Sequence, residues 1–187
     1  MLTITVDARD EIWDPSIGEF VSSPSGTLIL EHSLLSVSKW EAKYHKSFMK
    51  SVKNKDVSGE EIRYYIQCMT VNNVNKDVYN GLTTADLDKI FAYIADPMTA
   101  TVINSANKNG GQAARSSEVI TAELIYYWMV AHQIPFECQK WHLNRLLTLI
   151  EVCNVKNAPA KKMSKRDILK QNRSINAARR AKSKAHH

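Results

Sequence analysis

The spacing of apolar residues changes at Ser33, and this change constrains the fold more than any other feature of the chain. Before it, Leu2 to Val6 alternates between apolar and polar residues. Thr27 to Glu31 is a second short β-type run, and Glu19 to Val21 is a candidate third strand. After it, apolar residues recur every three or four positions, as in an amphipathic helix. The sequence therefore predicts a mainly α, α+β fold that opens with a small antiparallel β-hairpin or sheet in residues 1–32.

Three helices are predicted from the residues that would cap them. Ser33, Ser58 and Thr83 each precede a run with helical periodicity. The last two have an acidic residue three positions later, which is the spacing of a capping box. The run after Thr83 places Leu87, Ile90, Phe91 and Ile94 on one helix face. Lys50 to Asp56 is interpreted as a polar break between the first two helices, and Asn104 to Ser117 as a loop without periodicity.

Two further helices complete a predicted five-helix body over residues 33–154. Val119 to Val130 is apolar on nearly every side of a helix, which requires a central position or an interface. Its aromatic cluster, Tyr126 to Trp128, is expected in the core rather than stacked on bases. Pro135 fits the first turn of the last helix. Its predicted core stripe ends near Asn154 and consists of Phe136, Leu143, Leu146, Leu147, Ile150 and Cys153. These two helices are expected to pair antiparallel.

The charge of the last part of the chain is opposite in sign to that of the rest. Residues 155–187 hold eleven basic side chains and one acidic side chain, whereas residues 1–154 hold fourteen basic and eighteen acidic side chains. Such an asymmetry indicates a separate electrostatic unit that suits an acidic partner. Residues 155–187 are therefore predicted to form a basic C-terminal tail, with a helix from about Lys165 to about Ala181. Ser164 is the predicted cap of this helix, with Asp167 at capping-box spacing.

Three apolar residues, Ile168, Leu169 and Ile175, give this tail helix a narrow stripe that a purely solvating tail would not need. A basic amphipathic helix can lie in a groove of an acidic protein or along nucleic acid, and the stripe favours the protein. A solvated tail without a partner is the third interpretation. The candidate partner-binding residues are Lys161, Lys162, Lys165, Arg166, Ile168, Leu169, Arg173, Ile175, Arg179 and Arg180.

No spacing in the sequence points to a catalytic, cofactor or metal site. Cys138 and His142 are one helical turn apart, but a metal site would need a second close pair of ligands, so His142 is expected to pack at the edge of the core. Glu31 and His32 have the groups for acid–base chemistry, yet adjacent residues point in different directions. The next residue, Ser33, is better explained as a helix cap. We therefore expect a binding protein rather than an enzyme.

The cysteine content and the apolar runs bear on the compartment. Three scattered cysteines do not make a disulfide framework, which favours a reducing compartment. Residues 1–10 lack the basic and apolar regions of a signal peptide. No stretch approaches the roughly 18 consecutive apolar residues of a membrane span. No membrane partner is expected.

Several blocks of the sequence resemble a protein of siphophage-type tailed bacteriophages. The blocks are Leu30 to Leu34 with Ser38 to Glu41, Asp96 to Thr101, Glu123 to Met129, Ile134 to Leu147, and the tail segments Lys161 to Met163 and Asn176 to Arg180. The likeness runs over most of the chain, and the polar insert from Asn104 to Gln112 departs from it. The family is associated with the tail module, in particular with tail assembly chaperones, which engage the tape measure protein while the tail tube grows.

The resemblance implies a non-enzymatic assembly factor that binds the tape measure protein or other tail proteins in the host cell cytoplasm. It implies no cofactor and is compatible with a homo-oligomer. One alternative is a structural protein of the mature virion. Another is a nucleic-acid-binding protein that uses the basic tail, although the apolar stripe makes nucleic acid the less favoured partner.

Overall fold

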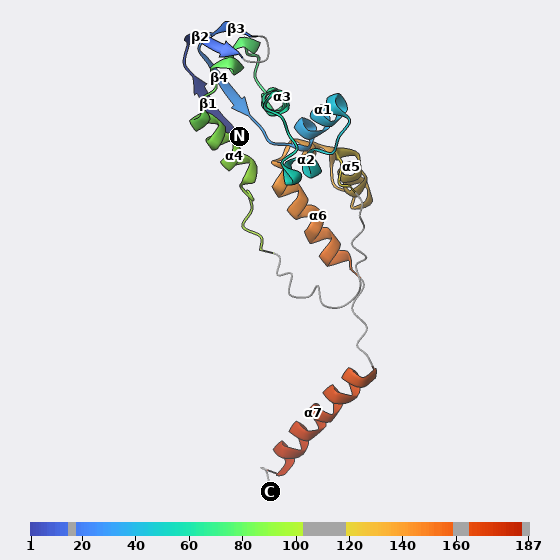
Figure 1. Ribbon diagram of the computed structural model, residues 1–187. Coiled ribbons are helices and arrows are strands. Elements are labelled where there is room, and N and C mark those ends of the chain that lie inside the picture. Colours follow the sequence, from blue (N-terminus) through green and yellow to red (C-terminus); the bar gives the residue numbers. More distant parts are fainter. Residues whose placement is uncertain (15–17, 103–118, 159–164, 185–187) are drawn as a thin grey trace. The chain divides into compact units, whose positions relative to one another are not determined.

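The computed structural model describes residues 1–14, 18–102, 119–158 and 165–184 (Figure 1). The chain divides into two compact units, Met1–Cys153, called the body below, and Asn154–His187. Helices dominate the described residues and strands occur only near the N-terminus, so the predicted mainly α, α+β fold is confirmed. The predicted loop and the polar insert that begins at Asn104, as well as the predicted cap Ser164, lie outside the described residues.

The strands form two small antiparallel sheets. β1 (Leu2–Val6) pairs with β4 (Gly26–Leu30), and β2 (Arg9–Asp14) pairs with β3 (Glu19–Ser23). The candidate strand Glu19–Val21 is confirmed as part of β3. Its partner β2 is an addition to the prediction, because the residues of β2 do not alternate between apolar and polar.

The helices begin where their capping residues predict. In chain order they are α1 (Leu34–Tyr44), α2 (Phe48–Asn54), α3 (Gly59–Met69), η1 (Lys76–Gly81), α4 (Thr84–Ala95), α5 (Ala122–Ala131), η3 (Phe136–Lys140), α6 (Leu143–Asn157) and α7 (Lys165–Lys184), of which η1 and η3 are 3-10 helices. The Ser33 hydroxyl accepts a hydrogen bond from the Ser36 N–H, while Ser58 and Thr83 form complete capping boxes. All three predicted caps are confirmed.

The segment predicted to be a polar break is mostly helical. Helix α2 covers Phe48–Asn54, so the body contains a helix beyond the five predicted. The Ser47 hydroxyl accepts from the Lys50 N–H at the start of α2, and the side chains of Phe48 and Ser51 are buried. Tertiary contacts thus stabilise a helix of only seven residues that would be unstable alone.

The helix predicted from Pro135 to about Asn154 is interrupted. Residues 136–140 form the 3-10 helix η3, and α6 begins only at Leu143. The Leu143 N–H donates to the His32 carbonyl at 2.8 Å, and Ser33 and His142 form an isolated β-bridge. These contacts hold His142 out of a continuous helix. Phe136, expected in the core stripe, is exposed.

The hydrophobic core joins the β1–β4 sheet to the helices of the body. Its largest fully buried side chains are Trp40, Leu28, Leu30, Leu34, Ile66, Met69, Ile90, Ile125, Met129, Leu143, Leu146 and Val6. The Trp40 indole N–H donates to the Glu61 carbonyl at 3.0 Å, so the polar edge of this buried ring has a partner. The free edge of β4 is also covered, since Glu31 N–H donates to Met69 and Val71 N–H donates to Ile29.

Glu41 of α1 holds two other helices by their first residues. Its Oε1 accepts from the Phe48 N–H of α2 at 2.8 Å, and its Oε2 accepts from the Ala122 N–H of α5 at 2.7 Å. Burial raises the pKa of Glu41, and the two backbone hydrogen bonds act against that rise. These N–H groups lack partners within their own helices, where a negative charge is also favourable. Glu41 therefore fixes α2 and α5 relative to α1.

Candidate functional site

Helix α7 carries most of the predicted partner-binding residues. It spans Lys165–Lys184, which confirms the helix predicted from about Lys165 to about Ala181. The described side chains between Arg166 and Arg180 are all exposed. Lys161 and Lys162 lie outside the described residues, so they are not placed on this helix.

The apolar stripe of α7 is open to solvent. Ile168 and Ile175 are two helical turns apart and therefore share a face, with Leu169 beside them. Leu169 is 60% exposed, and the two isoleucines are exposed as well. Arg166 and Arg173 lie close to this stripe in the helix. The helix thus presents an apolar strip with basic flanks.

Helix α5 exposes a second apolar face. Ala122, Ile125 and Met129 are buried, whereas Tyr127 is 65% exposed and Val130 is also exposed. The expectation that the aromatic cluster lies in the core is therefore wrong for Tyr127. The sequence predicts either a central position or an interface for this helix. A central position does not fit, because only one face of α5 packs against the core.

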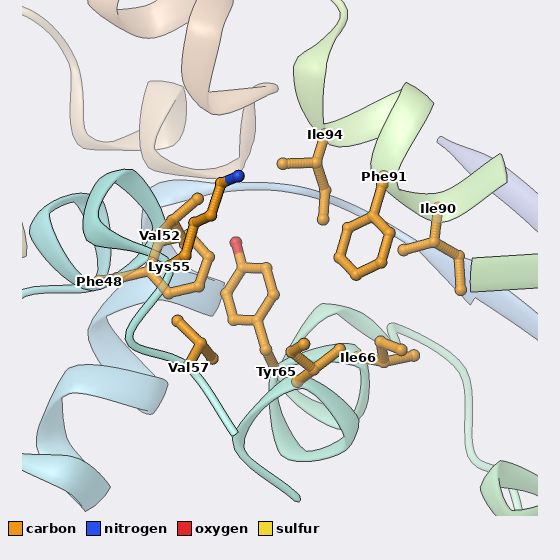
Figure 2. A pocket seen from close by; sticks show the side chains of 10 residues that line it. Phe48, Val52, Lys55, Val57, Tyr65, Ile66, Ile90, Phe91 and Ile94 are labelled. Atoms are coloured by element: carbon orange, nitrogen blue, oxygen red, sulfur yellow. The ribbon is translucent and has the colours of Figure 1, made fainter. Parts of the chain in front are cut away.

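An apolar groove lies between α2, α3 and α4 (Figure 2). Its volume is about 240 Å³, and it is lined by Phe48, Val52, Lys55, Val57, Ile62, Tyr65, Ile66, Ile90, Phe91 and Ile94. Figure 2 shows Phe48, Val52 and Lys55 on one side, facing the α4 side chains across Tyr65 and Ile66. Lys55 is the charged member of this lining.

Sequence reasoning anticipated one wall of the groove and missed the other. Ile90, Phe91 and Ile94 are predicted to share a helix face, and all three line the groove. Ile90 is fully buried but Phe91 is 44% exposed, so the apolar face of α4 is wider than the core needs. A stripe of this width is a signal of a binding surface. The opposite wall comes from α2, where the sequence indicates only a break.

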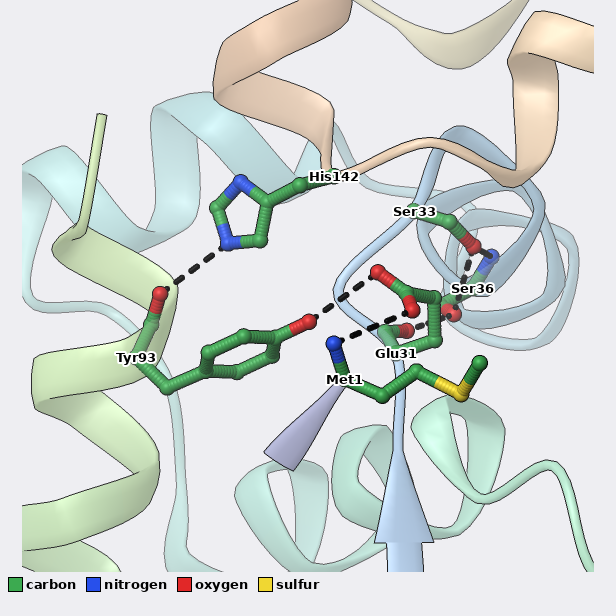
Figure 3. A network of polar contacts seen from close by, with 6 residues as sticks. All are labelled: Met1, Glu31, Ser33, Ser36, Tyr93 and His142. Atoms are coloured by element: carbon green, nitrogen blue, oxygen red, sulfur yellow. Dashed lines mark hydrogen bonds and ion pairs between the residues drawn. The ribbon is translucent and has the colours of Figure 1, made fainter. Parts of the chain in front are cut away.

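Two buried histidines face each other beside the core. The ring centroids of His32 and His142 are 5.0 Å apart. His32 Nδ1 lies 2.6 Å from the Tyr65 hydroxyl. His142 Nε2 lies 3.0 Å from the Tyr93 carbonyl, to which it must donate (Figure 3). The pKa of His32 is lowered to about 3, mainly by burial and to a smaller extent by the neighbouring His142. Burial also lowers the pKa of His142, so both rings are neutral near pH 7.

Glu31 belongs to the same polar network but points to other partners (Figure 3). The Tyr93 hydroxyl donates to Glu31 Oε1 at 3.0 Å, and the Met1 amino group lies 3.6 Å from Oε2. Burial, together with the bond to this carboxylate, raises the pKa of Tyr93. The carboxylate is thus engaged by groups of the chain itself. His142 packs into the core as expected, and Ser33 acts as the expected cap.

A surface hollow of about 430 Å³ lies beside this network, and its lining includes Glu31, Ser33 and Cys68. The hydroxyl of Ser33 serves the α1 cap, and Glu31 is paired with Tyr93 and Met1. Burial raises the pKa of Cys68, which keeps its thiol protonated and a poor nucleophile. Glu31 and Ser33 therefore serve structural contacts, and the Cys68 thiol beside them is not an activated nucleophile.

The described residues contain no group of three His, Cys, Asp or Glu side chains that could hold a metal ion. Cys138 lies in η3 and His142 precedes α6, so the expectation that they share one helical turn is wrong. Over the same described ranges, no helix is long and apolar enough to cross a membrane.

Comparison of the chain with protein-family models, curated proteins and solved structures gave no match. The likeness to siphophage tail proteins therefore rests on the sequence blocks alone. Within the described residues, exposed apolar side chains lie on α7 and on one face of α5, and apolar side chains line the groove between α2, α3 and α4.

Proposed function

We propose that this protein is a non-enzymatic, chaperone-like assembly factor for phage tails, which binds the tape measure protein or another tail protein. The sequence blocks support the phage tail context. The exposed apolar stripe of α7 supports binding, and it is the observation that carries the proposal.

The composition of α7 favours a protein partner with helical, acidic segments. Exposed isoleucine and leucine side chains gain free energy when a partner removes them from water. An amphipathic helix usually achieves this by laying its apolar face against a groove or a second helix. The basic residues on either side would attract an acidic partner and set its orientation. A tape measure protein is a long helical chain, and covering its apolar segments would keep it soluble until assembly.

Co-purification tests this function directly. The full chain is expressed together with the tape measure protein and the neighbouring tail proteins, and the captured proteins are quantified by mass spectrometry. We expect substitution of Ile168, Leu169 and Ile175 by serine to reduce capture by at least about tenfold. The matched control replaces Gln171, Asn172 and Asn176 of the same helix by serine and should capture as much partner as the unchanged chain. Equal capture by both variants would show that the apolar stripe of α7 does not bind the partner.

The protein composition of the mature particle distinguishes an assembly factor from a structural protein of the virion. An assembly factor leaves the tail before completion, so mass spectrometry of purified virions should find few or no copies. Abundant copies in mature particles would reject the assembly role and support a structural one.

The nucleic-acid alternative draws on the basic side chains of α7 and predicts a different salt response. Phosphate contacts release counterions, so DNA binding would weaken steeply, by orders of magnitude, between about 50 and 200 mM salt. Binding through the apolar stripe would change far less over the same range. Tight, salt-sensitive DNA binding that survives the triple serine substitution would favour nucleic acid.

A further inference from the structure

We propose that the apolar groove between α2, α3 and α4 binds an amphipathic helix of a partner protein whose apolar anchor side chains are flanked by acidic residues. Binding in this groove is independent of the phage tail role proposed for α7, because every residue that lines it belongs to the body.

The size of the groove suits side chains better than a separate small molecule. Its volume is about 240 Å³. A cavity of roughly 150 Å³ holds one benzene ring, whereas pockets for drug-sized ligands measure roughly 300–1,000 Å³. The groove therefore has room for one or two large apolar side chains, which is what a helix presents from positions three or four residues apart.

The walls of the groove are apolar and partly open to water. Val52 of α2 is 48% exposed and Phe91 of α4 is 44% exposed, while Tyr65 and Ile66 form a buried floor between them (Figure 2). Large side chains in this arrangement are desolvated only when something enters from outside. A helix lying between α2 and α4 would cover both walls at once.

Charge indicates which kind of helix fits. Residues 46–56 hold four lysines and one acidic residue, although the chain up to residue 154 has an excess of acidic side chains. Lys46 is paired with Glu61 at 2.6 Å. Lys55 lines the groove, and within the described residues its ammonium group has no carboxylate within ion-pair distance. A partner with Glu or Asp beside its apolar anchors would meet this basic wall favourably, and a partner with lysines there would be repelled.

Lys55 lies at the point where α2 ends. Lys55 ends α2 in the left-handed conformation, with φ of 57°, and its N–H donates to the Ser51 and Val52 carbonyls. The helix dipole favours a lysine at the end of a helix, which accounts for a positive charge there. It does not account for the orientation of the side chain. Figure 2 shows the Lys55 side chain on the same side of the groove as Val52.

Designed peptides provide the probe, since no natural ligand is needed to test the recognition chemistry. Three fluorescein-labelled helical peptides of about 18 residues carry the same leucine stripe at i, i+3, i+4 and i+7, with flanking positions filled by Glu, Gln or Lys. Their binding to the full chain is followed by fluorescence anisotropy. We expect saturable binding of the Glu peptide and an affinity at least about tenfold higher than that of the Lys peptide.

Substitutions in the groove and matched substitutions elsewhere locate the binding. Val52→Asp should weaken binding of the Glu peptide by at least about tenfold, and Phe91→Asp on the opposite wall should do the same. Val130→Asp is the control, because Val130 is an exposed helical valine on α5, outside the groove lining. Lys55→Glu should reduce the preference for the Glu peptide over the Lys peptide by at least about fivefold. Lys53→Glu, in the same helix but outside the groove lining, should change it by less. Circular dichroism of each variant confirms that the fold is kept.

The following results would overturn the proposal. They are a lack of saturable binding up to about 1 mM peptide, equal affinity for the Glu and Lys peptides, or equal losses from Val52→Asp and Val130→Asp. Dimerisation in sedimentation experiments that Val52→Asp abolishes would instead assign the groove to a second copy of this chain. Displacement of the peptide by dodecanoate at micromolar concentration would assign it to a small amphiphile. Failure of tail-protein capture by α7 would leave these peptide measurements unchanged, so the two proposals fail separately.

Discussion

In the body, several buried polar side chains bond to partners distant in the sequence, whereas the described side chains of α7 are exposed to solvent. The Glu41 carboxylate meets Ala122 across 81 positions, and Tyr93 meets Glu31 across 62. The helix α7 has its charges and its apolar stripe exposed instead. The body is therefore stabilised by tertiary contacts, while α7 depends on helix propensity and on any partner it binds. Substitutions of similar chemical size should have very different effects in the two regions.

The largest effect is expected for Glu41→Ala. This change leaves the N–H groups of Phe48 and Ala122 without their acceptor, and each unpaired buried donor costs about 1–3 kcal/mol. We expect the free energy of unfolding, measured by urea titration, to fall by about 3 kcal/mol or more. Glu151→Ala, at an exposed position of α6, is the control and should change it by less than about 0.5 kcal/mol. A similar small loss in both variants would show that the body does not depend on this contact.

The next effect is a loss of stability in acid through His32. Its pKa is about 3 in the folded chain and about 6.5 in an unfolded one. Below pH 6.5 the unfolded chain therefore binds a proton that the folded chain does not, and stability decreases until the pH approaches 3. Between pH 6.5 and 4.5 this amounts to about 2–3 kcal/mol. His142 is also buried with a lowered pKa and adds to the loss in the same direction.

The variant His32→Asn should remove this part of the pH dependence, as measured by urea titrations at pH 7.0, 5.5 and 4.5. Asparagine does not titrate, so the slope of stability against pH should become shallower even if the variant is less stable at every pH. His45→Asn is the control, since His45 is exposed in a left-handed helix cap that asparagine tolerates. Identical slopes for His32→Asn and the unchanged chain would contradict the expected role of His32.

A smaller loss is expected for Gly81→Ala. A Cβ at this position would lie 2.5 Å from Ser23 Oγ and 2.8 Å from Val6 Cγ1, closer than packed atoms approach. Overpacking of this kind costs about 1–3 kcal/mol, measurable as a lower urea midpoint. Gly59→Ala is the matched control, because a Cβ there meets open space in the first turn of α3. That change should leave the midpoint unchanged or raise it slightly. Equal midpoints for the two variants would show that η1 can move away from β3.

The smallest effect on the body is expected from Ala177→Gly in α7. Glycine lowers helix stability by about 1 kcal/mol at this exposed position, so the helical signal in circular dichroism should decrease. All four tryptophans lie in residues 1–153, so tryptophan fluorescence reports unfolding of the body alone. The free energy of unfolding of the body, measured by fluorescence in urea, should stay within about 0.5 kcal/mol of that of the unchanged chain. A larger shift would mean that the stabilities of the two units are coupled.

Features encoded within a few residues could be predicted, and features that depend on distant contacts could not. The caps at Ser33, Ser58 and Thr83 need only a side chain and the next turn, so their pattern is local. Helix α2 is stabilised by Glu41 and by burial of Phe48, neither of which appears in the sequence of residues 50–56. Periodicity alone therefore gives a break where the folded chain has a helix.

The candidate sites divide along the same line. The charge and stripe of α7 are contained in one segment, which is why residues such as Ile168 and Arg173 could be proposed from the sequence. The groove combines Val52, Tyr65 and Phe91 from three helices, and only the packing of those helices brings them together. The interruption before α6 is similar, because the His32 carbonyl that accepts from Leu143 is more than one hundred residues away in the chain.

The double bond made by Glu41 also has a consequence for synthesis of the chain. Residues 1–100 contain α1 to α4 and much of the core, yet one of the two acceptors on Glu41 has no donor until Ala122 has been made. At translation rates of about 5–20 residues per second, the 81 positions between them take roughly 4–16 s. During that time the Glu41 carboxylate of the nascent body lacks the Ala122 donor, and the surface that α5 covers is exposed. We therefore expect the body to become protease-resistant on the ribosome only after α5 has left the exit tunnel, in a single late step.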